Sequence, residues 1–388
     1  MNGFPGVEIR AERVRIGQDV RIGAGTVLVA DELVLGDGAV VEQGCDLRSA
    51  RLELAEHARV GQGSRWLVAE RARLGAGSVV DADAQVQCLE LSVGDETYVG
   101  QRWRVGGGAS MEPRSTVRVG DRCQIAPDVL VNPTEPVVIG DEVGISAQVA
   151  IFTHGYHAGH AVRHGHGAAF AGVTVGDGVW LGFRAVLLPG VAVGAGSIVA
   201  AAAAVAKPVP ASVLAGGVPA RVIRRLSPAS LDPAERTAAA DTAVHEWLRR
   251  LEFKGFAVAP AACPDDDRVA GRWTVSRDDR CWRIARVRPA DAAGPAAGTV
   301  EIADATAGPP VPAAAVFDFA EPLQVRGTLD ELGHDLREHL RRATWLFRYG
   351  RNSRGLVPQR FARLLDPSPA APAACPPPHR AGHGRASR

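Results

Sequence analysis

The strongest pattern in the chain is an aliphatic residue that returns every six positions. In the clearest run these residues are Val175, Leu181, Leu187, Val193, Val199 and Val205. A helix would repeat about every 3.6 residues and a simple strand about every two, so a period of six fits neither alone. Such a period is typical of short strands joined by regular turns. Three of these strands make a triangular coil of about 18 residues, and stacked coils form a solenoid.

The same pattern runs upstream in a looser form. Its key aliphatic positions are 16, 35, 54, 74 and 93, which lie 19 or 20 residues apart. That spacing equals one coil plus a residue absorbed at a corner. We therefore predict roughly ten coils over residues 14–217, with aliphatic side chains pointing inward and Gly permitting tight corners. An antiparallel β-sandwich with glycine turns is the alternative, which the strict six-residue count disfavours.

Two stretches interrupt the repeat. Residues 102–116 lose the phase, which indicates a loop or a junction between two segments of solenoid. Residues 152–172 lie between two clean runs and contain five histidines, at positions 154, 157, 160, 164 and 166. A solenoid tolerates long insertions at its corners because each coil packs only on its neighbours. Such loops often carry function on a rigid scaffold.

After residue 225 the pattern changes. The run Asp232-Pro233-Ala234-Glu235 predicts the start of a helix, with Asp as the cap and Pro at the first position. Short strand-like runs follow, and Thr328-x-x-Glu331 predicts a second helix that begins with a capping box. The chain thus divides into a solenoid domain (residues 1–227), a small α+β domain of unknown role (residues 228–365) and a disordered tail rich in Pro, Ala and Arg (residues 366–388).

The composition argues against several classes of function. The 388 residues include 44 basic and 43 acidic side chains, for a formal net charge of +1. This balance disfavours a protein that binds nucleic acid or an anionic membrane. No apolar run reaches the roughly 18 residues of a membrane span, and no apolar signal segment is visible. The six cysteines form no CxxC pair, so we expect scattered thiols in a cytoplasmic protein.

Four phrases near the end of the solenoid resemble the signature of the hexapeptide-repeat acyltransferases. They are V-G-D-G-V-W-L-G at 175–182, L-P-G-V at 188–191, G-A-G-S-I-V at 194–199 and G-G-V-P-A-R-V-I-R at 216–224. The detailed match covers about residues 119–226 and is most similar to the galactoside/maltose and exopolysaccharide O-acetyltransferases. It implies a mainly β protein with a left-handed parallel β-helix. It also implies a homotrimer whose active sites lie between subunits, with acetyl-CoA as co-substrate and no metal.

Acyl transfer from a thioester to a hydroxyl needs a base. Histidine is suited to that role because its pKa lies near about 6.5. By the resemblance, the catalytic histidine stands five residues after an inward aliphatic position, here Ile151, and that places it at Tyr156. Because position 156 is not a histidine, two candidates remain. His157 fits a one-residue insertion, and His154 directly follows Thr153.

The resemblance also assigns residues that bind the two substrates. Those expected to contact acetyl-CoA are Trp180, Gly182, Ala185, Lys207, Arg221 and Arg224. The Trp would line the groove, the two small residues would let the pantetheine arm lie close, and the cations suit the CoA phosphates. Asn132 and Tyr156 are expected to bind the acceptor, since an amide both donates and accepts hydrogen bonds.

Two alternatives come from other classes. A non-catalytic β-helix scaffold would keep the hexads but needs neither a loop histidine nor cations for CoA. A zinc enzyme similar to the γ-carbonic anhydrases needs a histidine on an earlier coil, and none lies between His57 and His154. The leading prediction is an acetyl-CoA-dependent O-acetyltransferase for a sugar or other small hydroxyl acceptor, with an amine acceptor also compatible.

Overall fold

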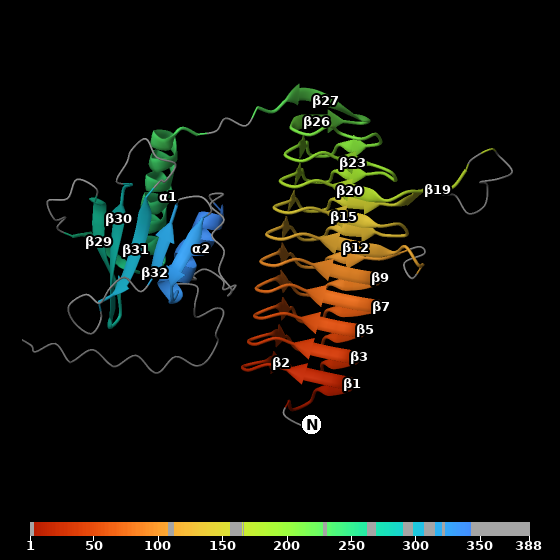
Figure 1. The fold of residues 1–388 in the computed structure, drawn as a ribbon, viewed down its shortest axis with the longest axis horizontal. Coiled ribbons are helices and arrows are strands. Elements are labelled where there is room, and N and C mark those ends of the chain that lie inside the picture. The colour runs from red at the N-terminus through yellow and green to blue at the C-terminus, as the bar shows by residue number, and fades with distance from the viewer. Residues whose placement is uncertain are drawn as a thin grey trace, which may run out of the picture. The chain divides into compact units, whose positions relative to one another are not determined.

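The computed structural model describes residues 4–107, 112–155, 165, 167–227, 231–261, 269–289, 298–305, 315–319 and 323–342. The chain divides into two compact units, and the division falls between Leu231 and Asp232. The first unit is a stack of coils, and the second combines a sheet with two helices (Figure 1). In the described ranges no helix is long and apolar enough to cross a membrane.

The first unit is a parallel β-helix whose coils have three faces. In the first coils one long strand forms both face 1 and face 3, because it bends around the corner between them. These long strands are β1 (Glu8–Ile16), β3 (Val27–Leu35), β5 (Asp46–Leu54), β7 (Arg65–Leu74) and β9 (Gln85–Val93). In later coils the two faces have separate strands, joined by a short turn or, after β11 and β17, by a longer insertion. Face 1 then holds β11 (Arg104–Val105), β14 (Leu130–Asn132), β17 (Ala150–Phe152), β22 (Val186–Leu187) and β25 (Ala204–Val205).

Face 3 of the later coils holds β12 (Thr116–Val119), β15 (Val137–Ile139), β20 (Val173–Val175) and β23 (Ala192–Val193). Face 2 holds β2 (Arg21–Ile22), β4 (Val40–Val41), β6 (Arg59–Val60), β8 (Val79–Val80), β10 (Tyr98–Val99), β13 (Gln124–Ile125), β16 (Gly144–Ile145), β21 (Trp180–Leu181), β24 (Ile198–Val199), β26 (Val213–Gly217) and β27 (Ala220–Arg225). The last of these strands runs antiparallel to its neighbour and closes the stack. A short hairpin of β18 (His154–Gly155) and β19 (Ala169–Phe170) leaves the coils at the corner between faces 1 and 3.

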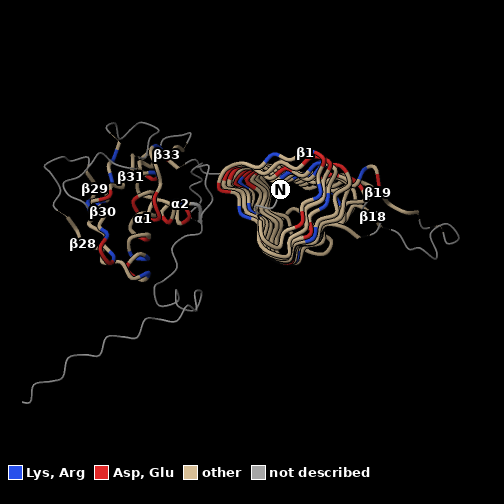
Figure 2. Tube along the Cα trace, turned by 90° about the horizontal axis from the view of Figure 1, so that it is seen from below, with Lys and Arg blue, Asp and Glu red and all other residues tan. Residues whose placement is uncertain are grey.

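The register of the strands follows the spacing of the sequence repeat. It advances by 19 residues from Glu8 to Val27 and again from Val27 to Asp46. Faces 1 and 3 form a 14-stranded sheet and face 2 an 11-stranded sheet, and the coils superpose when viewed along the stack (Figure 2). The predicted left-handed parallel β-helix of hexapeptide repeats, followed by a small α+β unit, is confirmed.

The core of the solenoid consists of the inward aliphatic positions. All six residues of the clearest hexad run are at most 2% exposed. The interior also encloses three thiols. Burial raises the pKa of Cys45 to about 11, of Cys88 to about 12 and of Cys123 to about 11. These cysteines are therefore protonated packing groups, since only a thiolate is a strong nucleophile.

A column of aspartates joins successive coils at the corner between faces 3 and 2. The Asp121 carboxylate accepts a hydrogen bond from the backbone N–H of Asp95 at 2.8 Å, and Asp141 accepts one from the N–H of Asp121 at 2.8 Å. The residue before each Asp is Gly because no side chain fits there. A Cβ on Gly94 would lie 2.3 Å from Oδ1 of Asp121. The Gly-Asp pairs thus fasten each turn to the next.

The second unit consists of two helices and a six-stranded antiparallel sheet. Its elements are α1 (Pro233–Phe253), β28 (Ala257–Pro260), β29 (Val269–Arg277), β30 (Arg280–Val287), β31 (Thr299–Asp304), β32 (Ala315–Asp318), β33 (Gln324–Gly327) and α2 (Glu331–Arg342). The helices are tied together by Asp335 of α2, which accepts a hydrogen bond from Trp247 Nε1 at 3.0 Å and pairs with Lys254.

The sequence predicts the first residue of one helix correctly and that of the other incorrectly. Asp232 caps α1 as predicted, and a reciprocal bond from its backbone N–H to Glu235 completes a capping box. The predicted cap of the second helix, Thr328, is wrong by two residues. Asp330 caps α2 instead, because its Oδ1 accepts from the N–H groups of Leu332 at 3.1 Å and Gly333 at 2.9 Å.

We expect Asp121→Ala to lower the free energy of unfolding of the solenoid by about 1–3 kcal/mol, because it leaves the backbone N–H of Asp95 without its acceptor. Asp121→Asn keeps a side-chain oxygen and should cost less. Asp31, which is exposed, provides the matched control Asp31→Ala. Urea unfolding followed by circular dichroism measures all three, and equal midpoints for Asp121→Ala and the control would contradict the role of the column.

Candidate active site

The root of the histidine hairpin is fixed by a buried threonine. Thr153 is fully buried between β17 and β18. Its hydroxyl donates to the backbone oxygen of Asn132 at 2.8 Å and accepts from the backbone N–H of Glu135 at 3.0 Å. On the return strand, the N–H of Ala171 donates to the oxygen of Thr153 at 3.0 Å. These bonds set the direction in which the chain leaves the coil (Figure 1).

The first residue of the hairpin is His154, one of the two predicted bases. Its Nδ1 lies 2.9 Å from Oγ1 of Thr134, which belongs to the preceding coil and is buried. Its ring stacks on Phe170 across the hairpin, with the ring centroids 6.3 Å apart and the planes at 26°. The imidazole is half-buried, so it is positioned by the fold while one part remains accessible. A proton on Nδ1 that is donated to Thr134 would leave Nε2 as the basic nitrogen.

Asn132, a predicted acceptor-binding residue, ends the strand β14 and pairs with Phe152 of the next coil, whereas Thr134 contacts His154. Its backbone oxygen accepts the hydrogen bond from the Thr153 hydroxyl. Its side-chain Oδ1 is buried and has no hydrogen-bond partner among the described residues. Gly107 faces the amide, and a Cβ there would lie 3.2 Å from Nδ2. Asn132 and His154 thus stand in successive coils, and His154 lies two residues beyond Phe152, the partner of Asn132. The other predicted residues of this loop, Tyr156 and His157, lie outside the described residues.

Trp180, Gly182 and Ala185 lie elsewhere, on and after face 2. The indole of Trp180 is 54% exposed, and its Nε1 donates to Ser146 Oγ at 3.0 Å. Ala185 is fully buried in the core, and this differs from the expectation that its side chain faces the pantetheine arm. Gly182 has a stacking role instead, because a Cβ there would lie 2.6 Å from the backbone nitrogen of Ala201 in the next coil.

The three predicted cations are all exposed near the end of the solenoid. Lys207 follows the last strand of face 1, whereas Arg221 and Arg224 lie on β27. A ladder of paired outward residues connects this strand with Trp180. Its members in order are Trp180, Ile198, Leu214 and Arg224. The fold thus gathers an exposed indole and a guanidinium on one face, which sequence spacing alone did not indicate.

Sequence reasoning missed Thr134 and Phe170, which both contact the imidazole of His154. Neither stands in a recognisable motif. The one signal is the coil length, because Thr134 and His154 lie 20 residues apart at equivalent places in successive coils. Phe170 could be found only from the pairing of the hairpin, in which it stands opposite His154.

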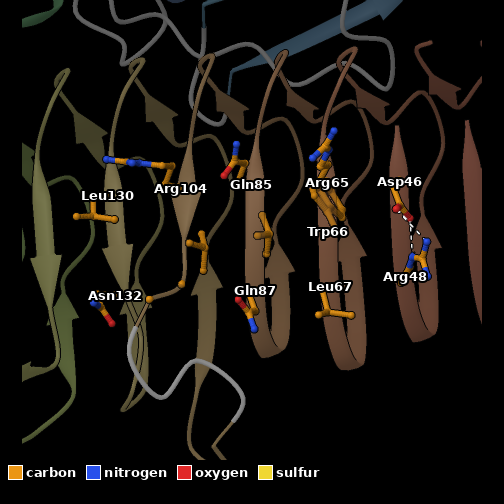
Figure 3. A pocket seen from close by; sticks show the side chains of 14 residues that line it. Asp46, Arg48, Arg65, Trp66, Leu67, Gln85, Gln87, Arg104, Leu130 and Asn132 are labelled. Atoms are coloured by element: carbon orange, nitrogen blue, oxygen red, sulfur yellow. Dashed lines mark hydrogen bonds and ion pairs between the residues drawn. The ribbon is translucent and has the colours of Figure 1, made fainter. Parts of the chain in front are cut away.

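A groove of about 770 Å³ opens on face 1 below Asn132. It crosses the strands from β14 down to β5 (Figure 3). Sequence reasoning did not identify it either, because its lining residues come from five coils and have no common motif. Among the described residues, no cluster of three or more His, Cys, Asp or Glu could hold a metal ion. Four of the five loop histidines lie outside the described residues.

The chain is similar to known acetyltransferases over part of its length. No protein-family profile matches it. A region of 129 residues, 32% of this chain, is 33% identical to the galactoside O-acetyltransferase of Escherichia coli K12 and covers 64% of that protein. Another region, of 78 residues and 18% of this chain, is 44% identical to a Staphylococcus aureus 2,3,4,5-tetrahydropyridine-2,6-dicarboxylate N-acetyltransferase and covers 33% of it. The chain thus spans less than two thirds of these relatives.

Solved structures give a weaker likeness. The hexapeptide-repeat acetyltransferase of Vibrio cholerae, in complex with acetyl-CoA, matches 40% of this chain and 70% of its own at 24% identity and a TM-score of 0.26. A galactoside acetyltransferase in complex with coenzyme A matches 38% of this chain and 64% of its own at 26% identity and a TM-score of 0.24. The predicted resemblance to hexapeptide-repeat acyltransferases is confirmed by the sequence relatives, and the chain is a parallel β-helix protein with an acetyltransferase-like region.

Proposed function

We propose that the protein is an acetyl-CoA-dependent O-acetyltransferase for a sugar or another small hydroxyl acceptor. One observation carries the proposal: the imidazole of His154 is held by Thr134 at the mouth of a hairpin, one coil above Asn132. The partial similarity to a galactoside O-acetyltransferase supports the same reaction. A scaffold without catalytic activity would need neither the buried hydroxyl beside the ring nor an unpartnered amide oxygen below it.

In the proposed reaction an imidazole of the hairpin accepts the proton of the acceptor hydroxyl. The hydroxyl oxygen forms a bond with the thioester carbonyl carbon, the carbon–sulfur bond breaks, and the proton passes to the CoA thiolate. Asn132 would orient the acceptor through its amide, because Asn132 lines the groove on face 1 and an amide both donates and accepts hydrogen bonds. The described geometry supports His154 as the base, and His157, with Tyr156 as an acceptor-binding residue, remains the alternative from the same loop.

The binding residues for acetyl-CoA would be Trp180, Arg221 and Arg224, with Lys207 and the backbone at Gly182 nearby. Trp180 and Arg224 share the outward ladder of face 2, whereas His154 stands at the corner between faces 1 and 3. Residues on different faces of one prism complete a site when copies of the chain pack side by side. This arrangement supports a homotrimer in which each groove takes residues from two subunits.

We expect His154→Ala to lower kcat for acetyl transfer by about 100-fold or more, because the acceptor hydroxyl loses its base. Thr134→Val should lower kcat less, by about tenfold, and change its pH profile, since the ring loses the partner of Nδ1. His57→Asn is the control, because Asn tolerates the positive φ of 54° at that corner. Free-thiol release measures the rates. If neither His154→Ala nor His157→Ala loses more than tenfold activity, the base assignment is wrong.

For the donor, Arg224→Gln should raise the KM for acetyl-CoA by about tenfold, which corresponds to one lost charge-assisted contact with a phosphate. Arg225→Gln is the matched control, because Arg225 pairs with Val213 rather than with the outward ladder. A thermal-shift titration supplies the direct test. Acetyl-CoA should raise the Tm and zinc should not. Stabilisation by zinc alone would favour a metalloenzyme and contradict the transferase.

The homotrimer predicts a composite site. Analytical ultracentrifugation should give a species of three chains, each of 40.7 kDa. Co-expression of a His154→Ala chain with an Arg221→Gln/Arg224→Gln chain should restore part of the activity, because some grooves then combine intact residues from two subunits. A monomer, or mixed assemblies with no recovered activity, would show that one chain holds the whole site.

A further inference from the structure

The groove on face 1 is built from two rows of outward side chains that run along the solenoid axis. The first row takes one residue from each strand, and these residues stand in register in successive coils: Asp46, Arg65, Gln85, Arg104 and Leu130. The second row contains Arg48, Leu67 and Gln87, and it ends at Asn132. Figure 3 shows both rows facing the groove. One continuous surface therefore leads from the proposed acceptor site to the earlier coils.

The charges of this surface are not balanced. Among the described lining residues Asp46 is the one carboxylate, and Arg48 engages both of its oxygens, at 2.7 and 3.0 Å. Arg65 and Arg104 are exposed and form no ion pair within the part of the chain that the structure describes. Two guanidinium groups are thus available to a ligand. The other polar lining groups are amides, which bind hydroxyls without adding charge.

The groove remains open beside Asn132 because two glycines occupy the coil below it. Gly106 replaces a side chain in the second row, and a Cβ there would lie 3.1 Å from the backbone oxygen of Gln87. Gly107 adjoins the amide of Asn132 with a φ of +97°. A larger residue at either position would close the path between Gln87 and Asn132. The buried Oδ1 of Asn132, which has no partner in the described ranges, marks the end of the path nearest to His154.

We propose that this groove binds the extended part of an anionic acceptor, a saccharide that carries carboxylate or phosphate groups away from the hydroxyl that is acetylated. The inference rests on the proposed acetyltransferase function, and it names the substrate class. Coils are spaced by about 4.8 Å, so Arg104 lies about one spacing and Arg65 about 14 Å along the axis from the level of Asn132. That span exceeds a single sugar ring. Leu67 and Leu130 offer apolar surface for sugar rings between the charged positions.

Arginine is the side chain that matches this ligand. Its planar guanidinium donates two parallel hydrogen bonds to a carboxylate or a phosphate. Acetyl-CoA also carries phosphates, but its proposed cations, which follow β25 or lie on β27, belong to the last coils of the solenoid, whereas Arg65 lies on β7 several coils earlier. The groove is therefore assigned to the acceptor rather than to the donor.

Binding can be measured without catalysis. The full chain with His154→Ala is titrated calorimetrically with three probes: an oligogalacturonide, UDP-glucose and a neutral malto-oligosaccharide of matched length. We expect at least one anionic probe to bind at least tenfold more tightly than the neutral one, with an affinity that falls as salt is raised. The oligogalacturonide tests a carboxylate-bearing acceptor and UDP-glucose a phosphate-bearing one. Equal affinities, or no binding by either anionic probe, would overturn the proposal.

The arginines provide the second test. Arg65→Gln and Arg104→Gln should each lower the affinity for the preferred anionic probe by about tenfold, because each substitution removes one charge-assisted contact. Neither variant should change binding of the neutral probe or the KM for acetyl-CoA. Arg21→Gln, an exposed arginine of face 2, is the matched control. If Arg65→Gln and Arg104→Gln instead alter the sedimentation coefficient and leave binding unchanged, the groove is a contact between chains and the proposal is wrong.

The two proposals can fail separately. If the protein binds anionic probes through Arg65 and Arg104 but transfers no acetyl group, the proposal for the groove is supported and the proposed transferase function is wrong. If the protein acetylates neutral acceptors and neither substitution changes the rate, the transferase function is supported and the proposal for the groove is wrong.

Discussion

The hydrogen bonding between successive coils is the constraint on which the rest of the structure depends. Each turn exchanges backbone hydrogen bonds with its neighbours: the N–H of Gly17 donates to Leu35 in the next turn at 2.8 Å, and that of Gly38 donates to Gln18 in the preceding turn at 2.7 Å. The stack therefore allows little freedom in strand position, because a shifted strand would leave buried amides unpaired. Glycine is required where two turns touch, as Gly94 shows. Functional groups can stand only on outward positions or in insertions at corners, and both proposed sites obey that limit.

This constraint explains how well the sequence predicts the solenoid. A period of six follows directly from the packing of inward side chains, and the 19-residue step between coils is visible in the aliphatic phrases. It also explains one incorrect expectation. Ala185 stands four residues after Leu181, the place that Val179 and Val191 occupy in their own hexads, and all three are buried. The six-residue period alone therefore predicts that Ala185 points inward. The family resemblance suggested a role in binding but did not indicate which way the side chain points.

The parts of the site that the sequence did not predict depend on long-range register. His154 was identified because histidine chemistry is recognisable, but its partner Thr134 is recognised only when two coils are placed on each other. The groove is a stronger case. Arg104 and Leu130 are neighbours in space although 26 residues separate them, because an insertion after Arg104 lengthens that coil. The sequence marks residues 102–116 as an interruption, but it does not indicate the register of the strands on either side. In the second unit, Asp330 rather than Thr328 caps the helix, a displacement that local capping preferences could not resolve.

The additivity of a solenoid suggests why the two proposed sites can share one prism. Each coil contacts only its neighbours, so coils added at the N-terminal end lengthen a face without disturbing the later coils. The long insertions at the corner between faces 1 and 3 follow β11 and β17, in the later coils. Below that point the long strands β5, β7 and β9 run around the corner without a loop, and face 1 stays uncovered by insertions of its own. Earlier coils can therefore change their outward residues, such as Arg65 and Gln87, to suit an acceptor while the stacking bonds and the histidine corner remain the same. Selection of the acceptor and chemistry at the hydroxyl would then be physically separate properties of one continuous backbone.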